Sequence, residues 1–319
     1  MTVVRTVLGD IEASEMGITY SHEHLIIDGG KPVELFPDFR LDDVDAAVEE
    51  LAPVIALGLG TVVDAMPCDA GRNVLKLAEI SRRTGVHIIA PTGLHHERYY
   101  DSLHWSRVAS AAEITELLTA DIDIGIDERD YGGPLVRRTS HRAGVIKVAG
   151  SLNRLSGLEE KVFEAAAAAH NRTGCPILTH CEQGTTGTIQ ADLLSSHGVD
   201  AESVALSHVD KVVDRGYHRE LFDRGVFVEY DQAFRWPQGE DNRTLRLLEW
   251  AAEDGNLGQV VLGLDAARRS YWRVHGGSPG MTYLLDHFVE AMRERGLDTT
   301  AQKHLFVTNP ARLYSFSQT

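Results

Sequence analysis

The segment Gly17–Ile27, GITYSHEHLII, combines the pattern of a buried strand with three consecutive ionisable side chains. Residues two apart in a strand point to the same face of the sheet. His22 and His24 are therefore expected to share one face, while Glu23 points away from them. Two imidazoles on one face of a buried strand indicate a functional interior, and a pair of hydrogen-bonded core histidines is the structural alternative.

Similar short apolar runs recur along the chain, each followed by an alanine- or leucine-rich amphipathic stretch. Including the first, the expected strands are Gly17–Ile27, Thr61–Ala65, Val86–Thr92, Val145–Ala149, Pro176–His180, Val204–His208, Val226–Asp231 and Gln259–Asp265. The expected helices between them are Asp42–Leu57, Asn73–Thr84, Ser110–Asp121, Gly157–Arg172, Gly187–His197, Asp214–Arg224 and Thr244–Glu253. Several of these helices end just before a glycine, which is typical of a helix C-cap.

This alternation predicts an α/β fold, specifically a (β/α)8 TIM barrel. The spacing of about 35 residues per strand–helix unit suits the roughly 250-residue core of that fold, and continuous apolar runs suit strands buried on both faces. A doubly wound parallel sheet is the alternative, because periodicity alone does not show closure. No linker divides the sequence, so we expect one catalytic domain over residues 1–319, with Thr282–Arg295 outside the barrel.

Composition narrows the class of protein. The chain has 31 Lys and Arg against 47 Asp and Glu, a formal net charge of −16, which argues against binding nucleic acid or an anionic membrane. The three cysteines form no CxxC pair, and no apolar run approaches the roughly 20 residues of a membrane span. The N-terminus carries no signal-peptide pattern. These observations predict a cytoplasmic protein.

Four more ionisable side chains lie at or near the ends of expected strands: Lys147, His180, His208 and Asp265. Active sites of this fold gather at the C-terminal ends of the strands. These four residues should therefore converge with His22 and His24 at one mouth. Four imidazoles and a carboxylate around one cavity predict a divalent metal site, with zinc or a similar transition ion as the occupant.

Lys147 is the unusual member of this set. Neighbouring cations should lower the pKa of its ammonium group and leave the amine neutral. A neutral amine can take up carbon dioxide and become a carbamate, which is an anionic oxygen ligand. A lysine that is salt-bridged inside the barrel is the alternative, and the sequence leaves both open.

Taken together, the HEH of the first strand, the lysine of the fourth, the histidines of the fifth and sixth and the aspartate of the eighth resemble the amidohydrolase superfamily, in particular its phosphotriesterase-like family. The resemblance extends from TVLGDIEASEMGITYSHEHL to FVTNPARLYSF. It implies a binuclear centre with His22, His24 and Asp265 on one metal and His180 and His208 on the other. Zinc is expected, with manganese or cobalt possible, and carbamylated Lys147 and a hydroxide would bridge the two ions. A homo-oligomer is a further expectation.

Three loop segments, DAARRSYW, HCEQG and YDQAFR, resemble the phosphorylated furanose lactonase group within that family. The resemblance implies that Arg235, Arg268 and Tyr271 bind a substrate phosphate, although Arg235 replaces the lysine associated with that group. Arginine forks also suit phosphate on general grounds. The implied reaction is attack of a metal-bridging hydroxide on a phosphorylated sugar 1,4-lactone, with Asp265 moving the proton.

Other functions remain open at this stage. A lactonase or esterase of hydrophobic substrates, such as acyl-homoserine lactones, or an organophosphate triesterase would use the same metals. A non-catalytic binding protein on this fold is a remoter alternative. Glu182, Gln183 and Thr185 are expected near the pocket. The sequence leaves undecided whether His95, His96, Tyr99 and Tyr100 contact a substrate or form a packed loop.

Overall fold

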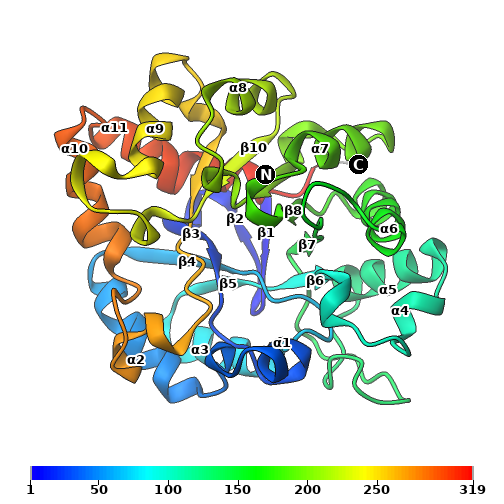
Figure 1. Ribbon diagram of the computed structural model, residues 1–319. Helices are drawn as coiled ribbons and strands as arrows, with labels where there is room; N and C mark the ends of the chain where they lie inside the picture. Colours follow the sequence, from blue (N-terminus) through cyan, green and yellow to red (C-terminus); the bar gives the residue numbers. More distant parts are fainter. Residues whose placement is uncertain (1, 318–319) are drawn as a thin grey trace.

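The computed structural model describes residues 2–317 and shows a barrel of eight parallel strands surrounded by helices (Figure 1). The third strand is broken by one residue into two pieces. In barrel order the strands are β3 (Ile18–Glu23), β4 (Leu59–Asp64), β5 (His87–Ile89) with β6 (Pro91–Gly93), β7 (Val145–Lys147), β8 (Ile177–His180), β9 (Val204–Ser207), β10 (Phe227–Tyr230) and β11 (Val260–Leu262). The predicted TIM barrel is thus confirmed.

The barrel closes between the first and last strands. The Asp265 backbone N–H donates to the His22 carbonyl at 3.0 Å, and the Glu23 carboxylate accepts the backbone N–H groups of Leu264 and Ala266. Gly263 permits this approach, because a Cβ atom there would lie 2.8 Å from the His22 backbone nitrogen. The closure places His22 and Asp265 side by side.

Helices follow the strands and form the outer ring. Those between successive strands are α2 (Val44–Ala56), α3 (Val74–Thr84), α4 (Trp105–Val108), α5 (Ala111–Asp123), α6 (Gly157–Thr173), α7 (Gly187–Ser196), α8 (Arg215–Asp223) and α9 (Arg243–Glu253), with the short α1 (Gly30–Leu35) before α2. The chain then runs through α10 (Val289–Glu294), α11 (Thr299–Lys303) and α12 (Asn309–Leu313). Gly85 and Gly174 adopt left-handed backbone conformations that end α3 and α6, as the glycine pattern predicts.

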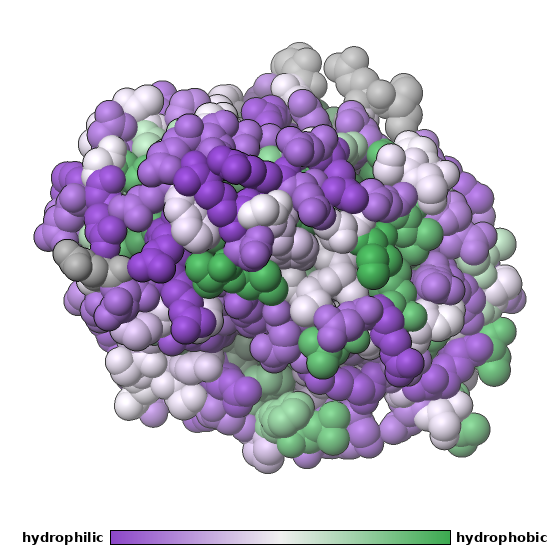
Figure 2. Space-filling model, turned by 45° about the horizontal axis from the view of Figure 1, so that its top comes forward, coloured by the Kyte–Doolittle hydropathy of each residue, from purple (hydrophilic) through white to green (hydrophobic). Residues whose placement is uncertain are grey.

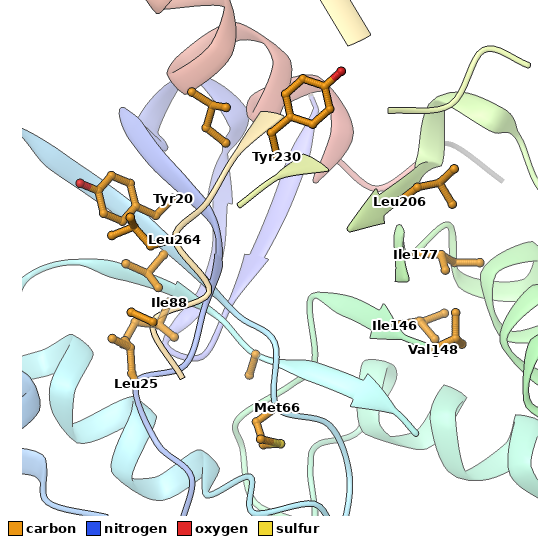
Figure 3. Close-up of a cluster of buried hydrophobic side chains, with 14 of the residues drawn as sticks. Tyr20, Leu25, Met66, Ile88, Ile146, Val148, Ile177, Leu206, Tyr230 and Leu264 are labelled. Carbon is orange, nitrogen blue, oxygen red and sulfur yellow. The ribbon is translucent and has the colours of Figure 1, made fainter. Parts of the chain in front are cut away.

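Strand alternation divides the core into two layers. Val145, Leu178 and Phe227 fill the inside of the barrel, whereas Ile146 and Ile177 pack outward against the helices. Figure 3 shows Ile146 and Ile177 directed away from the barrel centre. The next inward position after Val145 is Lys147, and the next after Leu178 is His180. The same alternation that builds the core therefore delivers functional side chains to the interior.

An antiparallel hairpin of β1 (Val3–Thr6) and β2 (Gly9–Glu12) precedes the barrel and was not predicted. Its Val4 packs with Met16 and Tyr314 against the apolar residues of the barrel interior. In Figure 1 the hairpin lies behind the centre of the strand ring. This packing closes the end of the barrel opposite the side-chain cluster described below.

The outer surface is largely hydrophilic, with small separate hydrophobic patches on the face shown in Figure 2. Among the helices described between residues 2 and 317, none has both the length and the apolarity needed to cross a lipid bilayer.

Candidate functional site

The ionisable side chains predicted from the strand ends meet at one mouth of the barrel. His22 and His24 stand at the end of β3, His180 ends β8, His208 follows β9 and Asp265 follows β11. They line a cavity of about 220 Å³ that also contains three further predicted residues, Arg235, Arg268 and Tyr271. The structure therefore brings eight of the nine predicted site residues into one cavity.

Lys147, the ninth, is buried at the end of β7 and does not form part of the cavity lining. Its Nζ donates to the Thr179 carbonyl at 3.2 Å. Burial lowers the pKa of the Lys147 ammonium group to about 8, although the charges of Glu229 and Asp265 oppose the shift. A substantial neutral fraction near physiological pH is what carbamate formation requires.

The donor atoms form two groups that share a centre. His24 Nε2 lies 3.4 Å from Asp265 Oδ1, and His22 Nε2 lies 3.9 Å from the same oxygen. Across the mouth, His180 Nδ1 faces His208 Nε2 at 2.9 Å. The rings of His22 and His208, whose centroids are 4.9 Å apart, connect the two groups. Imidazole nitrogens that converge on a carboxylate are a donor set suited to divalent transition ions.

Two buried carboxylates on β10 and just after it orient the imidazoles. Glu229 Oε2 lies 3.0 Å from His22 Nδ1, and Asp231 Oδ2 lies 2.7 Å from His208 Nδ1. The hydrogen bond between His22 Nδ1 and Glu229, and the negative charge of Asp231 beside His208 Nδ1, each favour a proton on Nδ1, which leaves Nε2 unprotonated toward the centre. Metal-binding histidines commonly have such carboxylate partners, so the donor set and its surroundings both fit bound metal.

Asp265 is held in an unusual geometry. Its backbone lies in the left-handed region at φ 51°, a conformation that non-glycine residues rarely adopt. The Arg235 guanidinium fixes it, because Nη2 donates to the Asp265 carbonyl at 2.6 Å and to Oδ2 at 3.1 Å. Burial would raise the pKa of the Asp265 carboxyl, but Arg235 and the facing histidines hold it well below its usual range. Asp265 is thus an oriented carboxylate.

Arg235 and Arg268 differ in their contacts. Besides Asp265, Arg235 donates to the carbonyls of Asp231 and Leu264, so both of its Nη groups are engaged. Arg268 lies 4.5 Å above the Phe39 ring and 3.8 Å from an Asp38 oxygen, with 36% of its side chain exposed. Arg268 is therefore the more available of the two for an anionic substrate group.

Lys211 also lines the cavity and was missed by the sequence analysis. Among the side chains that the structure describes, which exclude that of Glu240, no carboxylate lies within 4.0 Å of its ammonium group. The feature of the sequence that could have predicted its place in the cavity is its position three residues after His208, in the loop that follows β9. Arg98, in the loop after β6, and Glu182, in the loop after β8, also line this cavity. Gln183 lines it too, whereas Thr185 does not.

The four residues whose roles the sequence left undecided lie in the loop after β6 and fall into two pairs. His95 and Tyr99 line the cavity, with ring centroids 4.8 Å apart. Tyr100 is buried, where its hydroxyl donates to the Cys68 carbonyl. His96 is also buried, and its Nε2 lies 2.9 Å from Glu182. Two of these residues can therefore contact a substrate, and two support the loop.

Comparisons with known proteins agree with this geometry. The model of the phosphotriesterase family matches residues 2–314. The chain belongs to the phosphotriesterase family. A relative named phospho-furanose lactonase, from Mycoplasmopsis synoviae, is 34% identical over 98% of this chain and 92% of its own length.

Solved structures show the same family architecture. A crystal structure of an amidohydrolase from Mycoplasma synoviae matches with a TM-score of 0.94 and 33% identity, covering 99% of this chain and 93% of the other. The phosphotriesterase homology protein of Escherichia coli, solved with phosphate in its active site, matches with a TM-score of 0.85 and 30% identity, covering 94% and 99%. As a member of the phosphotriesterase family, the protein is a hydrolase, and dependence on a binuclear metal centre is typical of that family.

Proposed function

We propose that the protein is a metal-dependent lactonase that opens a phosphorylated sugar 1,4-lactone of the pentonolactone 5-phosphate type. The observation that carries the proposal is the arrangement of the cavity, in which the histidine–aspartate cluster shares one small space with Arg268, Lys211 and Tyr271. The first group suits a metal-assisted hydrolysis, and the second suits a phosphate. The relative named phospho-furanose lactonase and the phosphate in the Escherichia coli homologue support the same choice.

We assign the two metal sites as the donor geometry groups them. His22, His24 and Asp265 would hold one ion, and His180 and His208 would hold the other, with zinc as the expected metal and manganese or cobalt as substitutes. Lys147, as a carbamate, would add an anionic oxygen ligand. When bound, two divalent ions supply a hydroxide nucleophile near neutral pH and polarise the lactone carbonyl.

The remaining steps fall to side chains of the chain itself. Arg268, Lys211 and Tyr271 bind the phosphate and fix the sugar ring with its carbonyl toward the cluster. The Asp265 carboxylate accepts the proton of the attacking oxygen. It returns that proton to the ring oxygen as the C–O bond breaks, and a hydroxy acid leaves. Arg235, predicted from the sequence to contact phosphate, keeps Asp265 in the orientation that this transfer needs.

A substrate comparison tests the proposal. Zinc-loaded protein is assayed with a pentonolactone 5-phosphate, with the same lactone lacking phosphate, with a long-chain acyl-homoserine lactone and with an organophosphate triester. We expect kcat/KM to be highest for the phosphorylated lactone. Equal values for the two sugar lactones would refute the phosphate site, and faster turnover of the acyl-homoserine lactone or the triester would support a hydrophobic substrate instead.

A further inference from the structure

Three of the proposed metal-ligand histidines each have a carboxylate on the ring nitrogen that points away from the centre. For His22 and His208 these partners are Glu229 and Asp231, which are fully buried. For His180 the partner is Glu182, whose Oε2 lies 2.9 Å from His180 Nε2. Glu182 differs from the other two carboxylates because it lines the cavity and 19% of its side chain is exposed.

The same Glu182 oxygen is fixed from a second side. His96 Nε2 also lies 2.9 Å from Oε2, and the Arg98 guanidinium lies 3.5 Å away. His96 is itself buried, with its Nδ1 3.5 Å from the Glu159 carboxylate. The Glu182 carboxylate is therefore a shared acceptor that joins the loop after β6 to the end of β8.

This contact decides which nitrogen of His180 faces the centre. A carboxylate has no proton to donate, so His180 must carry its proton on Nε2 to make the bond. Nδ1 is then unprotonated, and it is the nitrogen that faces His208 Nε2 at 2.9 Å. Without Glu182, the imidazole loses both the constraint on its tautomer and the anchor that fixes its ring plane.

We propose that Glu182 is a positioning residue for the metal site formed by His180 and His208, acting through the Nε2–H of His180. The inference rests on the metal assignment made under the proposed function. It makes the two metal sites unequal. At the site of His22, His24 and Asp265 the supporting carboxylate is the buried Glu229, whereas the site of His180 and His208 has the buried Asp231 and, in addition, Glu182 at the cavity wall beside Arg98.

A different use of the same residues is a separate metal site, since His96, His180 and Glu182 each place one ligand atom within 4.8 Å of the others. That arrangement would require His180 Nε2 to lose its proton to solvent and to bind the metal through its lone pair. It predicts a third metal per chain that is lost when Glu182 is replaced. The positioning role predicts two metals per chain, one of which binds more weakly in the variant.

The experiment compares Glu182→Gln with the wild type and with Glu97→Gln as a matched control. Glu97 lies in the same loop as His96 and is 40% exposed, facing Arg107. Metal affinities are measured by chelator competition, and the cobalt-loaded proteins are compared by visible absorption. Thermal unfolding is followed with and without metal.

We expect Glu182→Gln to bind one of two metals about 10–100-fold more weakly, the range usual for an outer-shell partner. The cobalt spectrum should change, the Tm of the metal-free protein should not, and excess metal should restore kcat. Glu97→Gln should match the wild type. In a His180→Ala background, Glu182→Gln should have no further effect on metal affinity, because the two residues act as one unit.

Several results would overturn the inference. Unchanged affinities in Glu182→Gln, with two metals still bound by the wild type, would remove the role of Glu182 and leave the proposed function intact. A KM that stays raised at saturating metal would assign Glu182 to the substrate instead. Loss of a third metal would indicate the separate site. A wild type that binds fewer than two metals would overturn the metal assignment itself, and this inference with it.

Discussion

Replacing Arg268 with alanine should weaken the use of a phosphorylated lactone while sparing the same lactone without phosphate. Arg268 presents its guanidinium to the cavity, and among the described side chains the Asp38 oxygen at 3.8 Å is the carboxylate nearest to it. The substitution removes a cation that a substrate phosphate would contact. It leaves the histidine cluster and Asp265 untouched.

The size of the effect follows from the exposure of the side chain. A hydrogen bond to a charged partner contributes roughly 1.5–3 kcal/mol. Because 36% of the Arg268 side chain is exposed and water screens it, we expect a value near the lower limit. A loss of about 1.5–2 kcal/mol corresponds to a decrease in kcat/KM of about 10–30-fold, at 1.36 kcal/mol per tenfold change.

The assay measures kcat/KM for a pentonolactone 5-phosphate and its unphosphorylated form with each variant. Arg269→Ala is the matched control, since the Arg269 guanidinium contacts His275 and lies outside the cavity lining. Arg235→Ala provides a contrast, because it should slow both substrates alike by releasing Asp265. The reasoning is refuted if Arg268→Ala slows both substrates equally, or if it slows neither.

Three further predictions concern metal content, stability and pH. Lys147→Met should lower metal content, measured by elemental mass spectrometry, below two ions per chain, because no carbamate can form. Arg72→Met should lower the free energy of unfolding in urea by about 3–5 kcal/mol, since Arg72 is buried between Asp121 and Asp130 and its loss breaks both ion pairs; an unchanged urea midpoint would contradict this. Burial lowers the pKa of His218 to about 4, so the unfolded chain takes up a proton first as pH falls below 6.5. Between neutral pH and pH 4, the wild type should therefore lose about 3 kcal/mol more stability than His218→Gln. Urea titrations of both proteins at the two pH values measure this difference, and equal losses would contradict the prediction.

The barrel and the convergence of the ionisable side chains at its mouth were predictable because both follow from repetition. Each strand–helix unit buries a strand in the same way, and the C-terminal ends of parallel strands meet at one mouth. His180 and His208 could be assigned from their unit spacing alone. The same reasoning extends to Glu229 and Asp231, which stand two residues apart at the end of β10, as His22 and His24 do at the end of β3. Their spacing in the sequence could have been used to predict them.

Local irregularities were less accessible. β3 contains an extra residue between Tyr20 and Glu23 relative to its partner β4. The bulge allows Tyr20 to pack outward while His22, two residues later, points inward, so strict alternation does not describe this strand. The antiparallel hairpin was also missed, because its strands are only four residues long and contain few apolar residues.

Contacts between loops were the hardest to predict. The sequence indicates that Arg235 is a cation near the mouth, but only the folded chain shows that its guanidinium reaches the backbone and carboxylate of Asp265. Lys211 and Arg98 were overlooked for the same reason. Which side chains of a loop face a cavity depends on how neighbouring loops pack, and the periodicity of the sequence carries no information about that.

A metal titration tests the central claim most directly. Metal-free protein is titrated with zinc in the presence of bicarbonate while hydrolysis of a pentonolactone 5-phosphate is followed. We predict no turnover without metal, a rise in rate with added zinc and a plateau at two ions per chain. Full activity of the metal-free protein, or two bound ions with no hydrolysis of the phosphorylated lactone, would contradict the account.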